Sequence, residues 1–126
     1  MNSKFYISLE AARLLKEKGY NEATEYLHSD DIIYKGICLN YLKPELCGGM
    51  IAEDNSSYPC PTKAEAIDWL ESKGMLVWAE PTCEDIWMWF IISPLHFEDN
   101  TDTNGIAYPT RLEAEEAAII DALEIL

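Results

Sequence analysis

A short phrase that occurs twice constrains the fold of this chain more than any other feature. Residues 61–66 read Pro-Thr-Lys-Ala-Glu-Ala, and residues 109–114 read Pro-Thr-Arg-Leu-Glu-Ala. Each copy contains Thr-x-x-Glu, a pattern in which the threonine hydroxyl and the glutamate carboxylate bind each other's unpaired backbone N–H groups at a helix start. The phrase therefore predicts helices that begin at Thr62 and Thr110. Since the sequences after the two copies diverge, it predicts no repeat architecture.

A further helix is expected near the N-terminus. Ser8 is a favourable N-cap, apolar side chains recur after it at helical spacing, and Gly19 supplies a C-terminal stop. Gly74 follows the Thr62 helix in the same Leu-x-x-Lys-Gly setting. The three main helices are therefore expected at about 8–18, 62–73 and 110–125.

Two apolar segments after Gly74 have the composition of strands. Residues 75–79 and 87–92, joined by residues 80–85, are expected to form an antiparallel hairpin. The second segment reads Trp-Met-Trp-Phe-Ile-Ile, so it is apolar on both faces of the pleat. A strand with one face in water alternates apolar and polar residues. The pattern therefore predicts a central strand that is covered on both sides.

Shorter segments complete the expected order of elements. Residues 21–28 are expected to form a brief helix, and residues 32–39 and 106–108 to form short strands. Residues 40–61 contain proline, paired glycine and an Asp-Asn-Ser-Ser run, which predict a long loop. The acidic segment 98–105 is expected to be a loop as well.

These expectations define a fold class. A chain of 126 residues, 48% of them hydrophobic, has the size and composition of one domain with its own core. We expect a single α+β domain over residues 1–126. In it, a small antiparallel sheet, formed by the hairpin at about 75–92 and the short strands, packs against the three main helices.

The charge of the chain excludes several functional classes. The formal net charge is −14, and its distribution is uneven: net +2 over residues 1–20, −9 over 21–97 and −7 over 98–126. Because phosphate binding requires a basic patch, direct binding to nucleic acid or to an anionic membrane is not expected. The longest apolar run, residues 86–92, is too short to span a bilayer. With no signal-peptide core near the N-terminus, a cytoplasmic protein is expected.

No catalytic or metal-binding motif stands out. His28 and His96 lie in no recognisable nucleophile motif. Residues 98–105 resemble a calcium loop, but Arg111 occupies the position of its last acidic ligand. The cysteines lack the paired spacing of a zinc site and are expected to be reduced; they are Cys38, Cys47, Cys60 and Cys83. We expect no enzyme, no cofactor and no metal, with an enzyme or metal protein that uses the 40–61 loop as the alternative.

The helix expected at 110–125 has one unusual position. Its acidic residues occupy one arc of the helical wheel, and Ile120 lies in the middle of that arc. Such a residue is either an exposed apolar side chain of no consequence or a contact point for a partner. We therefore predict a partner-binding epitope consisting of Glu113, Glu116, Ile120 and Glu124.

The linear order of motifs resembles a known group of proteins. The order comprises the Ser-Leu-Glu-Ala-Ala start at residues 8–12, the Pro-Thr helix at 61–70, a tryptophan-rich strand, and Tyr-Pro-Thr-Arg at 108–111. It resembles the small, acidic, uncharacterised proteins encoded in gut Bacteroides-type genomes and in their phages and mobile elements. The resemblance covers most of the chain outside residues 30–57. It implies a phage-like or mobile-element accessory protein and identifies no catalytic residue.

Two functions follow as hypotheses. The first is a non-enzymatic interaction or accessory protein that binds a protein partner, basic in character, with self-association as a further alternative. The second is an acidic mimic of nucleic acid that inhibits a DNA-binding protein or a nuclease. The mimic requires the carboxylates to form one continuous surface.

Overall fold

The computed structural model of the chain describes residues 2–29, 32–35, 57–83, 86–94, 96–99 and 108–126. Its elements, in chain order, are η1 (Ser3–Phe5), α1 (Leu9–Glu17), β1 (Tyr26–Ser29), β2 (Ile32–Lys35), β3 (Tyr58–Cys60), α2 (Lys63–Ser72), β4 (Leu76–Cys83), β5 (Ile86–Ser93), β6 (His96–Asp99) and α4 (Arg111–Ile125).

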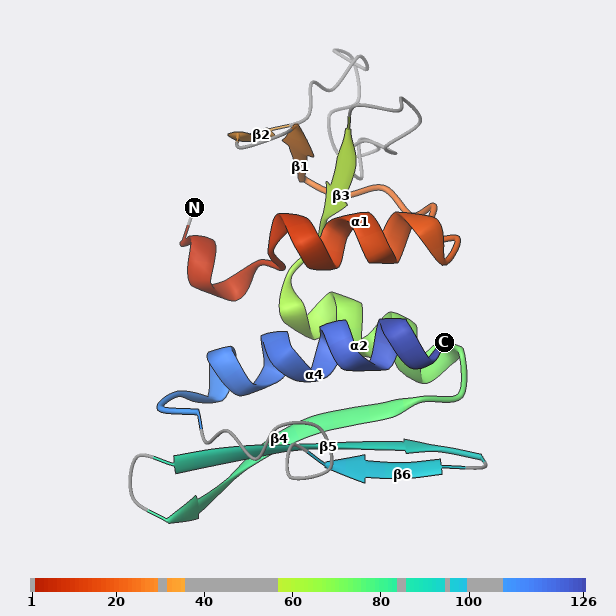
Figure 1. Cartoon of the computed structure of the whole chain (residues 1–126). Coiled ribbons are helices and arrows are strands. Elements are labelled where there is room, and N and C mark those ends of the chain that lie inside the picture. The colour runs from red at the N-terminus through yellow and green to blue at the C-terminus, as the bar shows by residue number, and fades with distance from the viewer. Residues whose placement is uncertain (1, 30–31, 36–56, 84–85, 95, 100–107) are drawn as a thin grey trace.

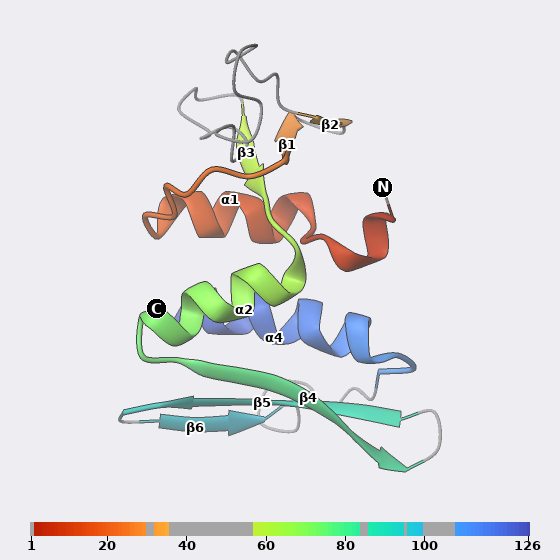
Figure 2. The same cartoon turned by 180° about the vertical axis from the view of Figure 1, so that it is seen from behind.

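The elements lie in layers (Figure 1). The sheet β4-β5-β6 forms one outer layer, and α2 and α4 lie together on one of its faces. On the far side of these helices lies α1, followed by the second sheet, β2-β1-β3; the reverse view shows the same order (Figure 2). The predicted α+β class and the three main helices are confirmed. The strands form two antiparallel sheets of three strands, however, where one small sheet was expected.

The helices begin where the sequence predicts. Thr62 accepts a hydrogen bond from the backbone N of Glu65 at 3.1 Å, and the Glu65 carboxylate accepts one from the backbone N of Thr62 at 3.0 Å. The complete reciprocal cap therefore forms at α2. At α4, the Thr110 hydroxyl accepts from the backbone N of Glu113 at 3.2 Å, which is one of the two bonds of that cap.

The predicted glycine stops are also confirmed. Gly19 and Gly74 have φ angles of 96° and 88°, in the left-handed region that other residues rarely adopt. Each glycine reverses the chain directly after a helix. For Gly74, the reversal sends the chain from α2 into β4.

The core extends from the β4-β5-β6 sheet through α2 and α4 to α1. Its centre is α4, which packs against α1, α2, β4 and β5. Five side chains of α4 are buried: Ala114, Ala118, Ile119, Ala122 and Leu123. Small alanines let the neighbouring backbones approach closely, and the larger side chains fill the remaining space. Lys63 adds a polar link, since its Nζ donates to the Leu112 carbonyl at 3.1 Å and joins the starts of α2 and α4.

Three predicted segments have a different structure. The brief helix expected at 21–28 is wrong, because Tyr26–Ser29 form β1 and pair with β2 and β3 at once. The loop expected at 40–61 ends in a strand, Tyr58–Cys60. Pro59 is compatible with it because β3 is an edge strand. The acidic loop expected at 98–105 begins as the end of β6, since Glu98 and Asp99 pair with β5.

The remaining strand predictions are partly covered by the described residues. The strand expected at 32–39 is observed as β2, and residues 36–39 lie outside the described part, as do residues 40–56. The connection expected at 80–85 is largely strand, because β4 continues through Pro81 to Cys83 with a register shift. Of the strand expected at 106–108, only Tyr108 is described, and it bridges Trp87.

Candidate functional site

The predicted epitope on α4 does not form one exposed face. Glu113 and Glu124 are exposed, whereas Glu116 and Ile120 are half-buried. Glu116 is already engaged: its Oε1 accepts a hydrogen bond from the backbone N of Ser8 at 2.9 Å, which ties α4 to the start of α1. Ile120 packs against the core cluster. Ile120 is therefore not a fully exposed side chain in the middle of the acidic arc, because it is half-buried against the core. Partner binding at these four residues stays a prediction.

The β4-β5-β6 sheet has two unlike faces. On the face toward the helices, Val77 lies opposite Ile91, and Ala79 lies opposite Trp89. Val77, Trp89 and Ile91 are almost fully buried. The other face carries the alternate residues of the same strands. We call it the outer face, and its apolar side chains are Leu76, Trp78, Ile86, Met88, Phe90, Ile92 and Phe97.

The outer face is exposed as well as apolar. Leu76 is 48% exposed, Ile92 38% and Phe97 57%. Both views place α1, α2 and α4 on the opposite side of this sheet, so none of these helices covers the outer face (Figures 1 and 2). A monomeric protein rarely exposes so many adjacent large apolar side chains, and such patches usually mark an interaction site.

Aromatic side chains cross the outer face from strand to strand. The rings of Trp78 in β4 and Phe90 in β5 stack, with centroids 5.2 Å apart and planes at 19°. Phe97 in β6 continues the row, with its centroid 6.3 Å from that of Phe90. Stacked rings lose little further conformational entropy when a partner binds. The row therefore presents a large apolar surface that is largely ordered before any contact.

The border of the outer face, formed by its two edge strands, carries acidic side chains. The three strands contain no lysine or arginine, but they contain Glu80, Glu98 and Asp99. The strand register places Glu80 opposite Met88 and Asp99 opposite Phe90, so both acids belong to the outer face. An apolar area with an acidic border favours a partner that combines apolar and basic groups.

Sequence reasoning missed this site for one reason. The all-apolar pattern of residues 87–92 predicts a strand covered on both sides. β5 is indeed the central strand, but only its Trp89/Ile91 side meets the helices. The prediction would have needed to ask how many helices can pack against each face of this sheet. With α1 stacked on the far side of α2 and α4, no main helix is left to cover the second face (Figure 1).

Two described residues with titratable side chains, Cys60 and His28, are buried. Burial, and secondarily the nearby Glu116 carboxylate, raises the pKa of the Cys60 thiol to about 12, which makes it a poor nucleophile at neutral pH. His28 is buried, and its Nε2 lies 2.9 Å from the Ile7 carbonyl. Within the described ranges, no group of three or more histidine, cysteine or acidic side chains could hold a metal ion. Cys38 and Cys47 lie outside those ranges.

Comparisons with known proteins add no family to this picture. No protein-family model matches the chain, and no significant match is found among curated proteins or solved structures. Among the described helices, none combines the length and the apolar character needed to cross a bilayer.

Proposed function

We propose that this chain is a non-enzymatic interaction protein that binds a protein partner through the outer face of the β4-β5-β6 sheet. The observation that carries the proposal is the aromatic row of the outer face, in which Trp78 and Phe90 are half-buried and Phe97 is exposed. Large aromatic side chains at the centre of an interface typically supply most of its binding energy. We further propose, from the sequence resemblance alone, an accessory role in the cytoplasm of a bacterial host, phage-like or mobile-element-like in origin.

The charge of the chain supports a basic partner over a second copy. Two copies that met through this face would each bring a formal charge of −14 and the acidic residues Glu80 and Asp99. Like charges across an interface oppose association, whereas a partner with basic groups around an apolar centre gains from the same residues. We therefore propose a partner whose apolar surface is bordered by lysine or arginine.

The contacts of several acids support this choice over the nucleic-acid mimic. A mimic needs its carboxylates available on one continuous surface. Glu65 caps α2, and Glu116 binds the backbone N of Ser8. Glu115 pairs with the Nε of Arg111 at 3.0 Å. These three carboxylates serve the fold itself and are not available to a partner in their present contacts.

Matched phenylalanine substitutions test the proposal. Phe97→Ser alters the outer face at a side chain that is 57% exposed. Phe5→Ser alters a phenylalanine of η1 that is 48% exposed and lies outside the three strands of this sheet. We expect a specific partner, quantified by mass spectrometry after affinity capture from host lysate, to be lost with Phe97→Ser and retained with Phe5→Ser. The partner should bind the purified wild type, and its recovery should fall as salt rises, because the border is charged.

Two results would contradict the proposal. One is a partner that both variants retain, since the outer face would then not be the binding surface. The other is a dimer in sedimentation velocity that Phe97→Ser dissociates and Phe5→Ser does not, since the occupant of the face would then be a second copy.

A further inference from the structure

A separate cavity lies on the opposite side of the molecule from the outer face. It is formed by α1 and β3, and its volume is about 310 Å³. In both views, α1 and β3 are separated from the β4-β5-β6 sheet by α2 and α4 (Figures 1 and 2). Among the described residues, the cavity is lined by Arg13, Lys16, Glu17 and Tyr58. Its size falls at the lower end of the range found for small-molecule sites.

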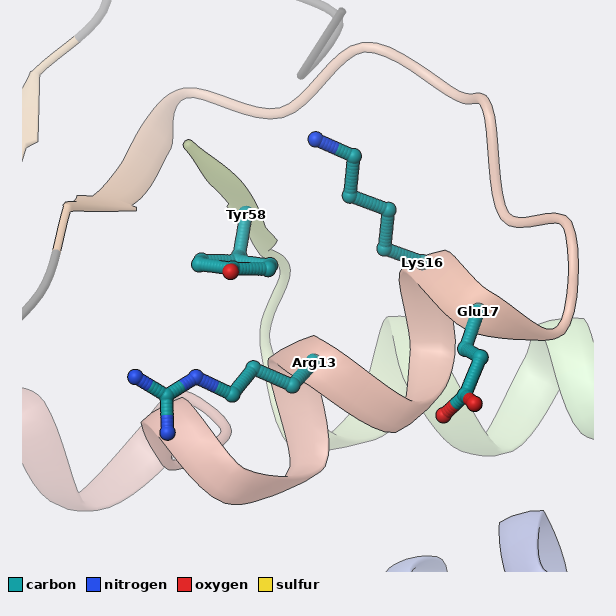
Figure 3. Close-up of a pocket in the computed structure, with 4 residues that line it drawn as sticks. All are labelled: Arg13, Lys16, Glu17 and Tyr58. Atoms are coloured by element: carbon teal, nitrogen blue, oxygen red, sulfur yellow. The ribbon is translucent and has the colours of Figure 1, made fainter. Parts of the chain in front are cut away.

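Two cations converge on one aromatic ring in this cavity. The guanidinium carbon of Arg13 lies 5.6 Å from the centroid of the Tyr58 ring, and the Nζ of Lys16 lies 5.2 Å from it. Figure 3 shows the two side chains reaching the ring from different sides. Arg13 and Lys16 are three residues apart and therefore share one face of α1. The Lys16 Nζ also donates to the carbonyl of Ser57 at 2.7 Å, which fixes α1 against the residue before β3.

The local charge differs from that of the rest of the chain. In Figure 3 the Glu17 carboxylate points away from Tyr58 and from both cations. No carboxylate pairs with Arg13 among the described residues, whereas Arg111 on α4 pairs with Glu115 at 3.0 Å. Among the described residues, the lining thus brings two cations and one carboxylate together in a protein of net charge −14. The cavity is open to solvent, and two cations gathered beside an aromatic ring there favour a negatively charged ligand.

The chemistry of arginine narrows the ligand class. A guanidinium close to an aromatic ring is attracted by the electrons of the ring, and its N–H groups are suited to a bidentate contact with an oxyanion. Carboxylate and phosphate groups both fit that geometry. We propose that the α1–β3 cavity binds a small molecule through a carboxylate or phosphate group, with Arg13 as the principal binding residue and Lys16 and Tyr58 orienting it.

Titrations with inorganic phosphate and with acetate test this proposal. Each anion is added at constant ionic strength and followed by the amide chemical shifts of the isotope-labelled full chain. We expect saturable shifts confined to residues of α1 and β3. A preference for phosphate assigns a phosphate-bearing ligand, and a preference for acetate assigns a carboxylate. Shifts spread over the whole surface, or no saturable shift with either anion, would overturn the proposal.

Arginine variants make the test specific. Arg13→Gln should weaken the apparent affinity about tenfold or more, because it removes a charge-assisted pair of hydrogen bonds. Arg13→Lys keeps the positive charge but cannot form the bidentate contact, so we expect an affinity for the anion between those of the wild type and Arg13→Gln. Arg111→Gln is the matched control and should bind like the wild type. Equal losses in Arg13→Gln and Arg111→Gln would show a general charge effect and would contradict a site at Arg13.

Discussion

The two faces of the β4-β5-β6 sheet come from alternate residues of the same strands, yet they have different surroundings. Trp89 and Ile91 are buried against the helices, while their sequence neighbours Phe90 and Ile92 lie on the outer face. Both sets are apolar, so hydrophobicity alone does not separate them. The two sets differ in burial. We therefore expect side chains toward the helices to contribute mainly to folding, and those on the outer face to contribute mainly to binding.

The largest expected effect comes from substituting neighbouring isoleucines. Ile91 is fully buried, whereas Ile92 is 38% exposed on the opposite face. We expect Ile91→Ala to lower the free energy of unfolding by about 3 kcal/mol, because it removes buried methyl groups and leaves a cavity. Ile92→Ala should cost less than about 1 kcal/mol. Urea denaturation of both variants measures the difference. Equal losses would mean that both faces are covered in solution.

The sequence predicts the helices well because their signals are local. Thr62 and Glu65 are three residues apart and form the cap without help from the rest of the chain. The same holds for the Ser8 hydroxyl, which accepts from the backbone N of Ala11. Gly19 ends the first helix by its own backbone geometry. Signals of this kind can be identified before any tertiary contact is known.

The sheets and the sites depend on contacts between residues that are far apart in the sequence. Local sequence patterns do not predict such contacts. Residues 26–29 form a strand only because Tyr26 pairs with Lys35 on one side and with Cys60 on the other. Tertiary pairing thus overrides a weak local helix pattern. The half-buried position of Ile120 likewise depends on tertiary packing, since its side chain lies against the core cluster. The convergence of Arg13 and Tyr58 needs two segments 45 residues apart in the sequence to meet.

The aromatic row offers a smaller effect that sharpens the comparison. Trp78 and Phe90 stack on the outer face, so their interaction should be measurable without any partner. In a double-mutant cycle with Trp78→Ala and Phe90→Ala, we expect a coupling free energy of about 1 kcal/mol. Leu76 and Ile92 are also directly opposite and supply a nonaromatic control pair, for which we expect a smaller coupling. No coupling between Trp78 and Phe90 would mean that the row is not ordered in the free protein.

The smallest expected effect on folding is at Phe97, and it separates the two roles of the sheet most directly. Phe97 lies on the edge strand β6 and is 57% exposed. Phe97→Thr should change the free energy of unfolding by less than about 1 kcal/mol, because threonine suits a strand and little buried area is lost. The same substitution should abolish partner capture if the outer face binds a protein. Thermal unfolding measures the change in stability, and affinity capture measures the loss of partner binding. Both are measured on the same preparation of the variant. A loss of stability of several kcal/mol would instead make Phe97 part of a core, and the outer face would then serve folding as the inner face does.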